Sequence, residues 1–495
     1  METLQKLIID SFIYKSDAIA VKTKKEEFSF NQYNDFILKT NLSFSDDKKV
    51  FIFTYKDIFA YSSVIACALQ GKTFVPLNST FPEQRLAKII NAVSSKTIIL
   101  TKDSIEAFNN FKFDFSDFTV LCVGFDKDLV SQKCNLISFD SLTPLKLDEI
   151  ELCDESVGAY NLFTSGTTGE PKGIEISHKN AYYYFKNNLE FYKFNPQDRL
   201  SQTFDISFDL FMHDIFMSFL SKAGLYVFDK MELMMPLKFI KDNKINVFFC
   251  VPSLAMNMQK LRLLKENSLD FIDMVIFCGE ALPLSVLDEF IKAAPNAKFI
   301  NIYGPTEATI AITRYIYEPK DREFFKNNIV PIGHIYKDNE YKIFDNELLL
   351  SGGQVITSYL NKDLKKPFLE LDGKIWYKTG DLVEENECGL IYLGRSDDQV
   401  KINGFRIELL EVEGVLKKVA NTPLAVCVVV DDKIYAFVEK VVEDENEEKN
   451  RIINECLKVL PHYMKISKVF FLDKLPLNVN SKIDKKELYA RYKDS

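Results

Sequence analysis

Short apolar runs rich in β-branched and aromatic residues alternate with amphipathic stretches along the first 300 residues of the chain. The clearest runs are four to six residues long and cover positions 49–54, 97–100, 119–123, 246–251, 274–277 and 298–302. Between the last two, residues 283–294 carry their apolar side chains at helical spacing. This alternation is typical of βαβ units, in which helices cover a largely parallel sheet. The sequence therefore predicts an α/β fold.

The pattern changes at about residue 330, where shorter alternating segments are separated by turns that contain glycine. Such turns favour an antiparallel region. The last 100 residues or so predict a small α+β domain with helices at 408–419 and 450–460 and strands at 424–430, 433–439 and 469–472. The acidic segment 443–448 is interpreted as a solvated loop or the start of a helix rather than as a binding tail.

Composition and charge narrow the possible functions. Hydrophobic residues make up 47% of the 495 residues and charged residues 27%, which is typical of soluble globular proteins. The 62 basic and 71 acidic residues give a net charge of −9, which disfavours dedicated nucleic-acid binding. Nine scattered cysteines without a CxxC pair indicate reduced thiols in a cytoplasm. No signal peptide or long apolar stretch is present, so we expect neither export nor membrane insertion.

The segment TSGTTGEPKG at 164–173 is the strongest local candidate for binding chemistry. Glycine allows close backbone approach, and hydroxyls, amides and one ammonium are donors that suit a polyphosphate. The segment is not a Walker A loop, because Pro171 precedes Lys172 and Gly173 follows it. An ordinary surface turn is the alternative interpretation of this segment taken alone.

A family resemblance emerges from this segment together with five other blocks. Residues 162–178 resemble the signature loop of the adenylate-forming superfamily, which includes acyl-CoA synthetases, luciferases and amino-acid adenylation domains. The other blocks follow in the order of the superfamily: FCGEALP at 277–283, NIYGPTE at 301–307, YKTGDL at 377–382, GRSDDQVKINGFRIE at 394–408 and LPLNVNSK at 475–482. A weaker match covers 74–78 and 82–85, so the resemblance spans roughly residues 45 to 490.

The resemblance implies a large N-terminal domain over 1–393, with mainly parallel sheets and an antiparallel subdomain, and a mobile α+β lid over 394–495 that rotates about Asp397. It also implies a two-step reaction. A carboxylate first attacks the α-phosphorus of ATP, with Mg²⁺ present, to give an acyl-adenylate and pyrophosphate. A thiol then accepts the acyl group. Both steps bring anions together, so cations and oriented donors must offset their repulsion.

Within the superfamily, the blocks at 277–283 and 301–311 are most similar to the D-alanine carrier protein ligases. This narrower similarity implies a small amino acid as substrate, with D-alanine favoured. No second module fits within 495 residues. The implied acceptor is therefore the phosphopantetheine thiol of a separate carrier protein.

The resemblance assigns a nucleotide-binding role to a set of residues spread over the chain. Tyr303 would stack on adenine, Thr306 would contact the α-phosphate, and Glu307 would hold Mg²⁺ in a catalytic role. The full set implied to bind ATP is Thr164, Ser165, Gly166, Thr167, Thr168, Gly169, Lys172, Gly279, Glu280, Tyr303, Gly304, Asp381 and Arg395.

Lys482 is the first-ranked catalytic candidate. A lysine in a polar segment near the C-terminus is ordinarily a solvated surface group. The matching lysine of the superfamily instead reaches the active site and bridges the substrate carboxylate and the α-phosphate. Ser481 stands where the motif usually has glycine, which limits access to positive φ. Lys485 and Lys486 are nearby lysines that do not match the motif.

The segment 202–217 resembles the substrate block of the superfamily, in which an Asp after Phe pairs with the α-ammonium of the substrate. Asp209 is favoured for this role because it keeps the family spacing, and Asp205 is the alternative. A buried carboxylate facing an apolar acyl tail would be costly, so the block favours an amino acid over a fatty acid. His213 and Cys278 match positions that shape the substrate pocket. The alternatives are a structural histidine on an apolar helix face and an inert core thiol.

Two other functions stay open at this point. An acyl-CoA synthetase would activate a fatty or aryl acid and would not need Asp209. A catalytically silent protein that binds an adenylate or a carrier on the same fold would release no pyrophosphate. A catalytically silent protein is disfavoured by the joint presence of Lys172, Glu307, Asp381 and Lys482.

Overall fold

The protein is described from a computed structural model that covers residues 2–12, 14–164, 171–360, 367–477 and 483–494. The chain divides into two compact units, each described by itself below. The large unit comprises Met1–Ser79, Val93–Leu162 and Gly173–Ser396. The small unit comprises Thr80–Ala92, Phe163–Lys172 and Asp397–Ser495.

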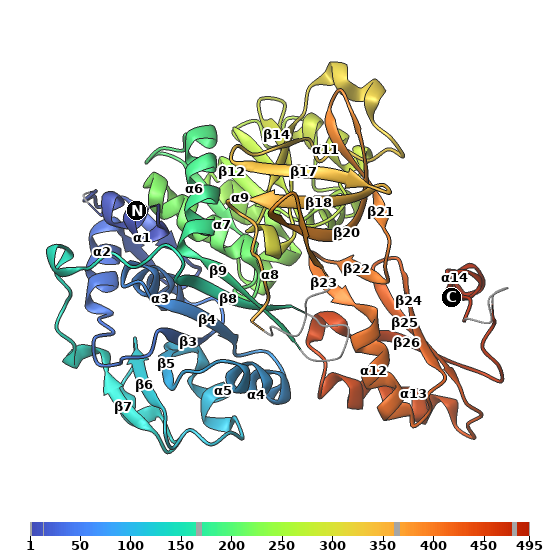
Figure 1. The fold of residues 1–495 in the computed structure, drawn as a ribbon, viewed down its shortest axis with the longest axis horizontal. Helices are drawn as coiled ribbons and strands as arrows, with labels where there is room; N and C mark the ends of the chain where they lie inside the picture. Colours follow the sequence, from blue (N-terminus) through green and yellow to red (C-terminus); the bar gives the residue numbers. More distant parts are fainter. Residues whose placement is uncertain (1, 13, 165–170, 361–366, 478–482, 495) are drawn as a thin grey trace. The chain divides into compact units, whose positions relative to one another are not determined.

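A seven-stranded sheet with the order β7-β6-β5-β3-β4-β8-β9 contains the first apolar runs of the chain (Figure 1). The pairs from β7 to β8 are parallel, and Phe51 of β3 lies opposite Val75 of β4 and Ile98 of β5. The strands are β3 (Lys49–Thr54), β4 (Thr73–Asn78), β5 (Thr97–Thr101), β6 (Thr119–Val123), β7 (Asn135–Ser138), β8 (Gly158–Thr164) and β9 (Lys172–Ser177).

A second, nine-stranded sheet of the large unit has the order β16-β15-β14-β13-β12-β10-β11-β1-β2. Its central pairs are parallel, whereas β2, β15 and β16 pair antiparallel at its two ends. The strands are β1 (Ile19–Lys22), β2 (Glu27–Ser29), β10 (Arg199–Gln202), β11 (Gly224–Val227), β12 (Val247–Cys250), β13 (Met274–Phe277), β14 (Lys298–Tyr303), β15 (Thr313–Ile316) and β16 (His334–Ile335).

Helices cover both faces of this second sheet, because its central strands are apolar on both sides. Phe249 and Ile276 join one hydrophobic core with α1, α3, α6 and α7, and Phe248 and Val275 join another with α9, α10 and α11. The helices of the large unit are α1 (Leu4–Ser11), α2 (Phe30–Lys39), α3 (Ile58–Leu69), α5 (Ile105–Asn110), α6 (His178–Tyr192), α7 (Asp209–Ser221), α8 (Lys230–Met234), α9 (Pro236–Asn243), α10 (Pro252–Lys260) and α11 (Leu284–Ala293).

A third sheet of the large unit is antiparallel, with the order β17-β18-β20-β19 and with β21 paired to β20. Trp376 of β20 is the only tryptophan of the chain; it is buried, and its Nε1 donates to the carbonyl of Leu371 at 3.3 Å. The strands are β17 (Asn339–Phe344), β18 (Glu347–Gly352), β19 (Phe368–Leu371), β20 (Lys374–Asn386) and β21 (Gly389–Arg395).

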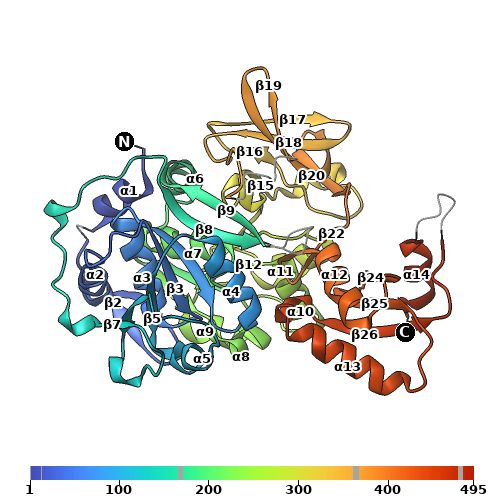
Figure 2. The same cartoon turned by 60° about the horizontal axis from the view of Figure 1, so that its bottom comes forward.

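The small unit is built on the sheet β24-β25-β26. Alternate residues of β24 face opposite sides: Cys427 packs with α12 and α13, and Val428 packs with Leu488 of α14. Figure 2 shows α13 and α14 on opposite sides of this sheet. The elements are α4 (Glu83–Ala92), β22 (Gln399–Ile402), β23 (Phe405–Glu408), α12 (Leu409–Ala420), β24 (Ala425–Val430), β25 (Lys433–Glu439), α13 (Glu445–Leu457), β26 (Ile466–Leu472) and α14 (Lys485–Tyr492).

The α/β fold class predicted from the alternation is confirmed. All six predicted runs are strands, and their ends shift by one residue at most. The helix expected over 450–460 instead covers Glu445–Leu457, because the side chain of Asp444 accepts the backbone N–H groups of Asn446 and Glu447 and starts the helix within the acidic segment. The two alternatives for that segment thus resolve in favour of a helix start.

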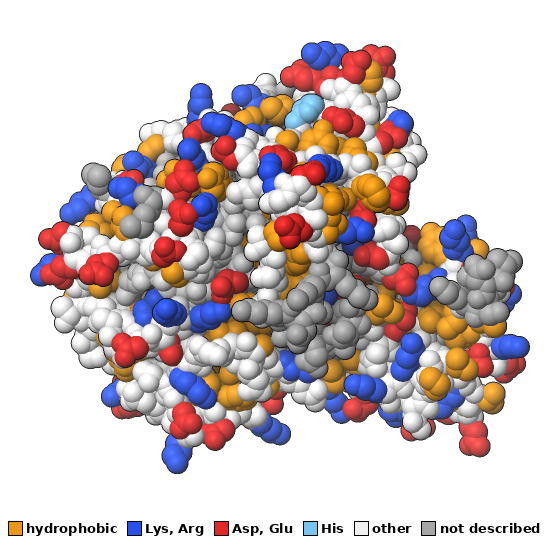
Figure 3. Space-filling view, in the orientation of Figure 1, with side chains coloured by type: hydrophobic (Ala, Val, Ile, Leu, Met, Phe, Trp, Pro, Cys, Tyr) orange, Lys and Arg blue, Asp and Glu red, His pale blue; other side chains and the backbone are white. Residues whose placement is uncertain are grey.

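The surface carries charges of both signs. Figure 3 shows Lys and Arg side chains mixed with Asp and Glu side chains over the face that it draws. No helix in the described part of the chain is both long and apolar enough to cross a bilayer. All nine cysteines are free, and seven of them are buried.

Candidate active site

Helix α7 begins with two of the residues expected to bind the substrate. Asp209 is its first residue, where a carboxylate is stabilised by the N-terminal end of the helix dipole. His213 follows four residues later, so the two side chains share one helix face about 6 Å apart along the axis. Both side chains are buried. The helix therefore presents a carboxylate and an imidazole one turn apart.

The imidazole of His213 is held inside a cluster of aromatic rings. Its Nδ1 lies 2.7 Å from the hydroxyl of Tyr184 on α6. The ring makes edge contacts with Phe249 at 4.9 Å and with Tyr192 at 5.8 Å between centroids. Burial lowers the pKa of His213 to about 3, and the charge of Arg314 acts in the same direction. The imidazole is therefore neutral near pH 7.

Asp205 is engaged within the fold. Both oxygens of its carboxylate accept from the side-chain amide of Asn78, at 2.9 and 2.7 Å. One oxygen also accepts from the backbone N–H and the hydroxyl of Ser207, at 2.9 and 2.6 Å. This is the hydrogen-bonding pattern of an Asx turn before a helix. Asp205 thus has a structural role that accounts for the repeated Phe-Asp motif.

The block after β13 places three predicted residues side by side. Cys278 is buried at the end of the strand, and Gly279 follows with a positive φ of 97°, which glycine adopts without strain. A carboxylate oxygen of Glu280 accepts the backbone N–H of Ser253 at 2.8 Å, at the start of α10. Glu280 therefore caps a neighbouring helix, a role that the motif did not indicate.

Asp381 joins two residues that lie far from each other in the sequence. Its Oδ2 accepts from the hydroxyl of Tyr303 at 2.5 Å, and its Oδ1 accepts from Nη1 of Arg395 at 2.6 Å. All three side chains are largely buried. Burial, with the charge of Asp381, raises the pKa of Tyr303, so the phenol stays protonated and donates. The structure thus brings together a ring, a carboxylate and a guanidinium predicted to bind a nucleotide.

Glu307 lies in the 3₁₀ helix η5 (Thr306–Ala308), directly after predicted Thr306. Its side chain is buried, and its Oε1 accepts from the hydroxyl of Tyr359 at 2.7 Å. Gly304 precedes this turn at a close backbone approach, because a Cβ there would lie 2.6 Å from Cα of Ala311.

The described residues hold no group of three or more His, Cys, Asp and Glu side chains placed to bind a metal. A divalent cation at Glu307 would accordingly complete its shell with oxygens of a bound phosphate and water, which is the usual arrangement for Mg²⁺.

The small unit holds the remaining described candidates. Thr164 ends β8, and its hydroxyl is buried without a hydrogen-bond partner among the described residues. Nζ of Lys172 lies 3.0 Å from a carboxylate oxygen of Glu408, which also accepts from Gln399 at 2.7 Å. Asp397 accepts the backbone N–H of Gln399 at 3.2 Å. The predicted residues Ser165, Gly166, Thr167, Thr168, Gly169 and Lys482 lie outside the described residues.

Two hydroxyls that no motif indicates contact the predicted residues. Tyr184 lies 29 residues before His213, and Tyr359 lies 52 residues after Glu307. Neither belongs to a conspicuous motif, so only the fold reveals these contacts. The apolar face of α6 was a signal that Tyr184 points inward, but not that it meets an imidazole.

Comparison with known proteins finds a family, curated relatives and a solved structure that this chain resembles. The model of the family described as AMP-binding enzyme matches residues 15–359. The chain is 29% identical over 502 residues to the D-alanine–D-alanyl carrier protein ligase of Lactococcus lactis subsp. lactis (strain IL1403), and 29% identical over 486 residues to the protein of the same name from Staphylococcus aureus (strain Newman), with 95% of each chain covered in both cases. The solved adenylation domain AlmE of Vibrio cholerae, in complex with glycyl-adenosine-5'-phosphate, matches with a TM-score of 0.90 and 26% identity over 100% of this chain and 98% of that one.

Proposed function

Because this chain belongs to the AMP-binding enzyme family and is an adenylate-forming ligase, we propose that it activates a small amino acid with ATP and transfers it to the thiol of a carrier protein. The expected membership of the adenylate-forming superfamily is thereby confirmed. The amino acid carboxylate would attack the α-phosphorus of ATP and release pyrophosphate. The thiol of phosphopantetheine would then attack the acyl carbon and release AMP.

The choice of an amino acid as substrate rests on the buried carboxylate and imidazole on α7. Asp209 offers a buried carboxylate at a helix start, and a buried carboxylate needs a cationic partner such as an α-ammonium. Asp205 is bound by Asn78 and Ser207 in an Asx turn, and Asp209 keeps the family spacing, so we assign the α-ammonium to Asp209. An acid without an amino group would leave Asp209 without this partner.

His213 supports a small side chain on that amino acid. The imidazole lies one turn below Asp209 and is fixed by Tyr184, so it would close the pocket shortly beyond the α-carbon. Cys278, buried at the end of β13, would form another part of the wall. D-alanine is our first choice, in line with the names of the related ligases. Glycine is the second, because the related adenylation domain AlmE holds a glycyl-adenylate.

The residues around Asp381 would hold the nucleoside. The ring of Tyr303 is anchored through its hydroxyl, so its face would be pre-oriented to stack on adenine. Asp381 would accept from the ribose hydroxyls, and Arg395 would hold it ionised and oriented. Gly279, Glu280 and Gly304 would complete the adenine-binding wall. Each of these roles can be tested separately from the choice of amino acid.

Charge in the transfer step would be balanced by several groups. Thr306 would contact the α-phosphate, and Glu307 would hold Mg²⁺, which neutralises phosphate charge when bound. We assign the β,γ-phosphates to Thr164, Lys172 and the residues 165–169, and we assign the bridging ammonium to Lys482. An oriented donor of this kind typically accounts for about 10²–10³ in rate.

The two steps would share one site through movement of the last 100 residues or so. We propose a core over 1–393 and a lid over 394–495, with the hinge at Asp397. The acceptor would be a separate phosphopantetheinylated carrier protein, in line with the names of the related ligases. A cytoplasmic location stays a prediction from the cysteine composition.

Pyrophosphate release over a panel of acids tests this proposal directly. The panel holds both enantiomers of alanine, glycine, larger amino acids, and fatty and aryl acids, each with ATP and Mg²⁺. We expect release with D-alanine or glycine, loss of it in Lys482→Ala, and persistence of it in the neighbouring Lys486→Ala. Release confined to fatty or aryl acids would overturn the role of Asp209 and favour an acyl-CoA synthetase. No release with any acid would favour a silent binding protein.

A further inference from the structure

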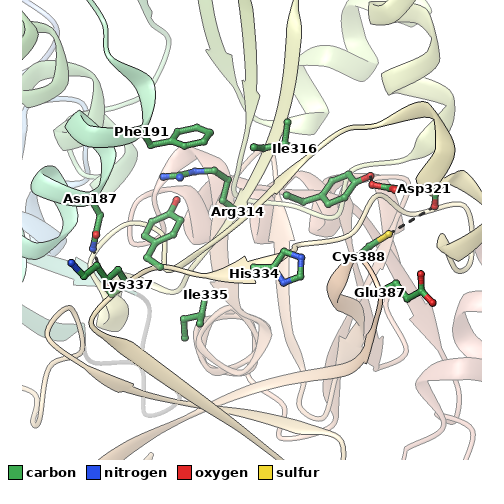
Figure 4. A pocket seen from close by; sticks show the side chains of 12 residues that line it. Asn187, Phe191, Arg314, Ile316, Asp321, His334, Ile335, Lys337, Glu387 and Cys388 are labelled. Carbon is green, nitrogen blue, oxygen red and sulfur yellow. Dashed lines mark hydrogen bonds between the residues drawn. The ribbon is translucent and has the colours of Figure 1, made fainter.

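A cavity of about 430 Å³ lies in the large unit at the edge formed by β15 and β16, outside the residues assigned to the reaction (Figure 4). Asn187 and Phe191 of α6 form one side of it, and Ile316 and Ile335 form apolar parts of its lining. The cavity is large enough for a small organic molecule. The charges and hydrogen-bonding groups of its lining indicate which class of molecule it would bind.

Arg314 is the unusual feature of this lining. Its guanidinium carbon lies 3.4 Å from the ring centroid of Phe191 and 4.6 Å from that of Tyr336, so two aromatic rings flank the cation. Its Nη2 donates to Oδ1 of Asn188 at 2.8 Å. Its Nε is buried and has no hydrogen-bond partner of good geometry among the described residues. Among the residues that the structure describes, no carboxylate oxygen lies within 4.0 Å of this guanidinium.

Two buried tyrosines lie beside the same guanidinium. The ring of Tyr192 lies 5.3 Å from the guanidinium carbon, and Tyr336 flanks it. Both hydroxyls are buried and interact with the guanidinium of Arg314, and neither has a further hydrogen-bond partner within the described chain. Buried polar groups are paired in the great majority of cases, so hydroxyl protons without an acceptor beside this cation indicate a missing acceptor.

The acidic residues of the lining do not supply that acceptor. Figure 4 shows Asp321 and Glu387 on the opposite side of the cavity from Arg314. Asp321 accepts from the hydroxyl of Tyr315 at 2.9 Å, and Glu387 is exposed. The cationic end of the cavity is therefore uncompensated.

We propose that this cavity is a second small-molecule site, in which Arg314 binds the carboxylate of a small organic acid. A carboxylate matches the planar edge of a guanidinium and could accept from the tyrosine hydroxyls as well. The apolar side chains of Phe191, Ile316 and Ile335 would contact the carbon part of the ligand. A free phosphate fits less well, because the other basic residues of the lining, His334 and Lys337, are exposed.

Calorimetric titration of the full-length protein with sodium benzoate tests the proposal. Chloride keeps the ionic strength constant, and sodium phosphate is titrated in parallel. We expect saturable binding of benzoate with a Kd on the order of 1 mM or below. Arg314→Gln should weaken it by about tenfold or more, since a hydrogen-bonded charge is lost. Arg322→Gln is the matched control, because Arg322 is a nearby arginine that pairs with Asp288 outside the cavity.

A second variant keeps the test valid if Arg314→Gln fails to fold. Ile316 is 41% exposed at the cavity, so Ile316→Trp should fill the space while leaving Arg314 and the core in place. Loss of benzoate binding in this variant, with binding retained in Arg322→Gln, supports the site. Binding that persists in both cavity variants would place the acid elsewhere and overturn the proposal. Binding of phosphate alone, or no saturation up to roughly 50 mM benzoate, would also overturn it.

Discussion

The hydroxyl of Tyr184 on α6 lies 2.7 Å from Nδ1 of His213 on α7, and both side chains are buried. The bond joins two helices and fixes the plane of the imidazole that would close the substrate pocket. A residue outside every motif thus sets the position of a residue inside one.

Tyr184→Phe should destabilise the protein by about 1–3 kcal/mol, because a buried Nδ1 loses its partner. It should also reduce the preference for D-alanine over larger D-amino acids by several-fold, since the imidazole could then rotate. Urea unfolding and pyrophosphate release measure the two effects. Tyr183→Phe is the matched control, because that hydroxyl binds Glu2 at the edge of the fold. Equal effects of the two variants would contradict the role of Tyr184.

The two buried histidines should make the protein less stable in mild acid. Burial lowers the pKa of His213 to about 3 and that of His178 to about 4. The unfolded chain therefore binds more protons below pH 6.5, and stability falls as the pH decreases towards these folded-state values. Each histidine should add up to about 1.4 kcal/mol per pH unit to the slope of the unfolding free energy against pH. His178→Gln should flatten the slope between pH 6.5 and 5, as measured by urea unfolding. An unchanged slope would contradict the burial argument.

Asp381→Asn should lower kcat/KM for ATP by about a hundredfold, because the amide cannot pair with Arg395 as an ion. Asp372→Asn removes an exposed carboxylate that pairs with Lys342 on the same sheet, and it should leave kcat/KM unchanged. Pyrophosphate release at varied ATP compares the two variants. A similar ATP response in both would refute the nucleoside role.

Tyr359→Phe should raise the Mg²⁺ concentration needed for half-maximal activity by several-fold, because Oε1 of Glu307 loses a hydrogen bond that orients it. Tyr341→Phe removes a comparable bond to Glu385 at the surface and serves as the control. The measurement is initial rate against Mg²⁺ at saturating ATP. An unaltered Mg²⁺ requirement would argue that Glu307 holds no metal.

Lys485→Met should loosen the small unit. Nζ of Lys485 lies 3.0 Å from the buried Glu413 and 3.1 Å from Asp398, and Glu413 in turn accepts the backbone N–H of Cys427. Loss of the cation leaves the buried carboxylate of Glu413 without an ionic partner, a cost on the order of 2 kcal/mol. Hydrogen exchange along β24 should become faster in Lys485→Met and not in Lys486→Met. Equal protection in the two variants would count against this reasoning.

The hydrophobic pattern predicted much of the fold because strands and helices each space their apolar residues at a characteristic period. The runs at 49–54, 119–123 and 274–277 match β3, β6 and β13 residue for residue. The helix at the acidic segment was misplaced because a single cap, Asp444, outweighs the hydrophobic period at a helix start. Capping is a one-residue effect that periodicity cannot show.

The candidate site could be predicted only as far as its residues belong to motifs. Tyr303, Asp381 and Arg395 were named from three separate blocks, and the fold joins them. The contact between Tyr359 and Glu307 depends on the chain path of the antiparallel sheet, which no local pattern encodes. Motifs therefore supplied the candidate residues but not the side chains that contact them.

The lone tryptophan, Trp376, has a practical consequence for spectroscopy. Because it is buried in β20 of the large unit, intrinsic tryptophan emission acts as a reporter of that antiparallel sheet. Asp381 lies on the same strand, five residues further along. A nucleotide bound at Asp381 should thus shift the tryptophan emission. Unfolding of the small unit alone should leave this emission unchanged, and circular dichroism should detect it instead.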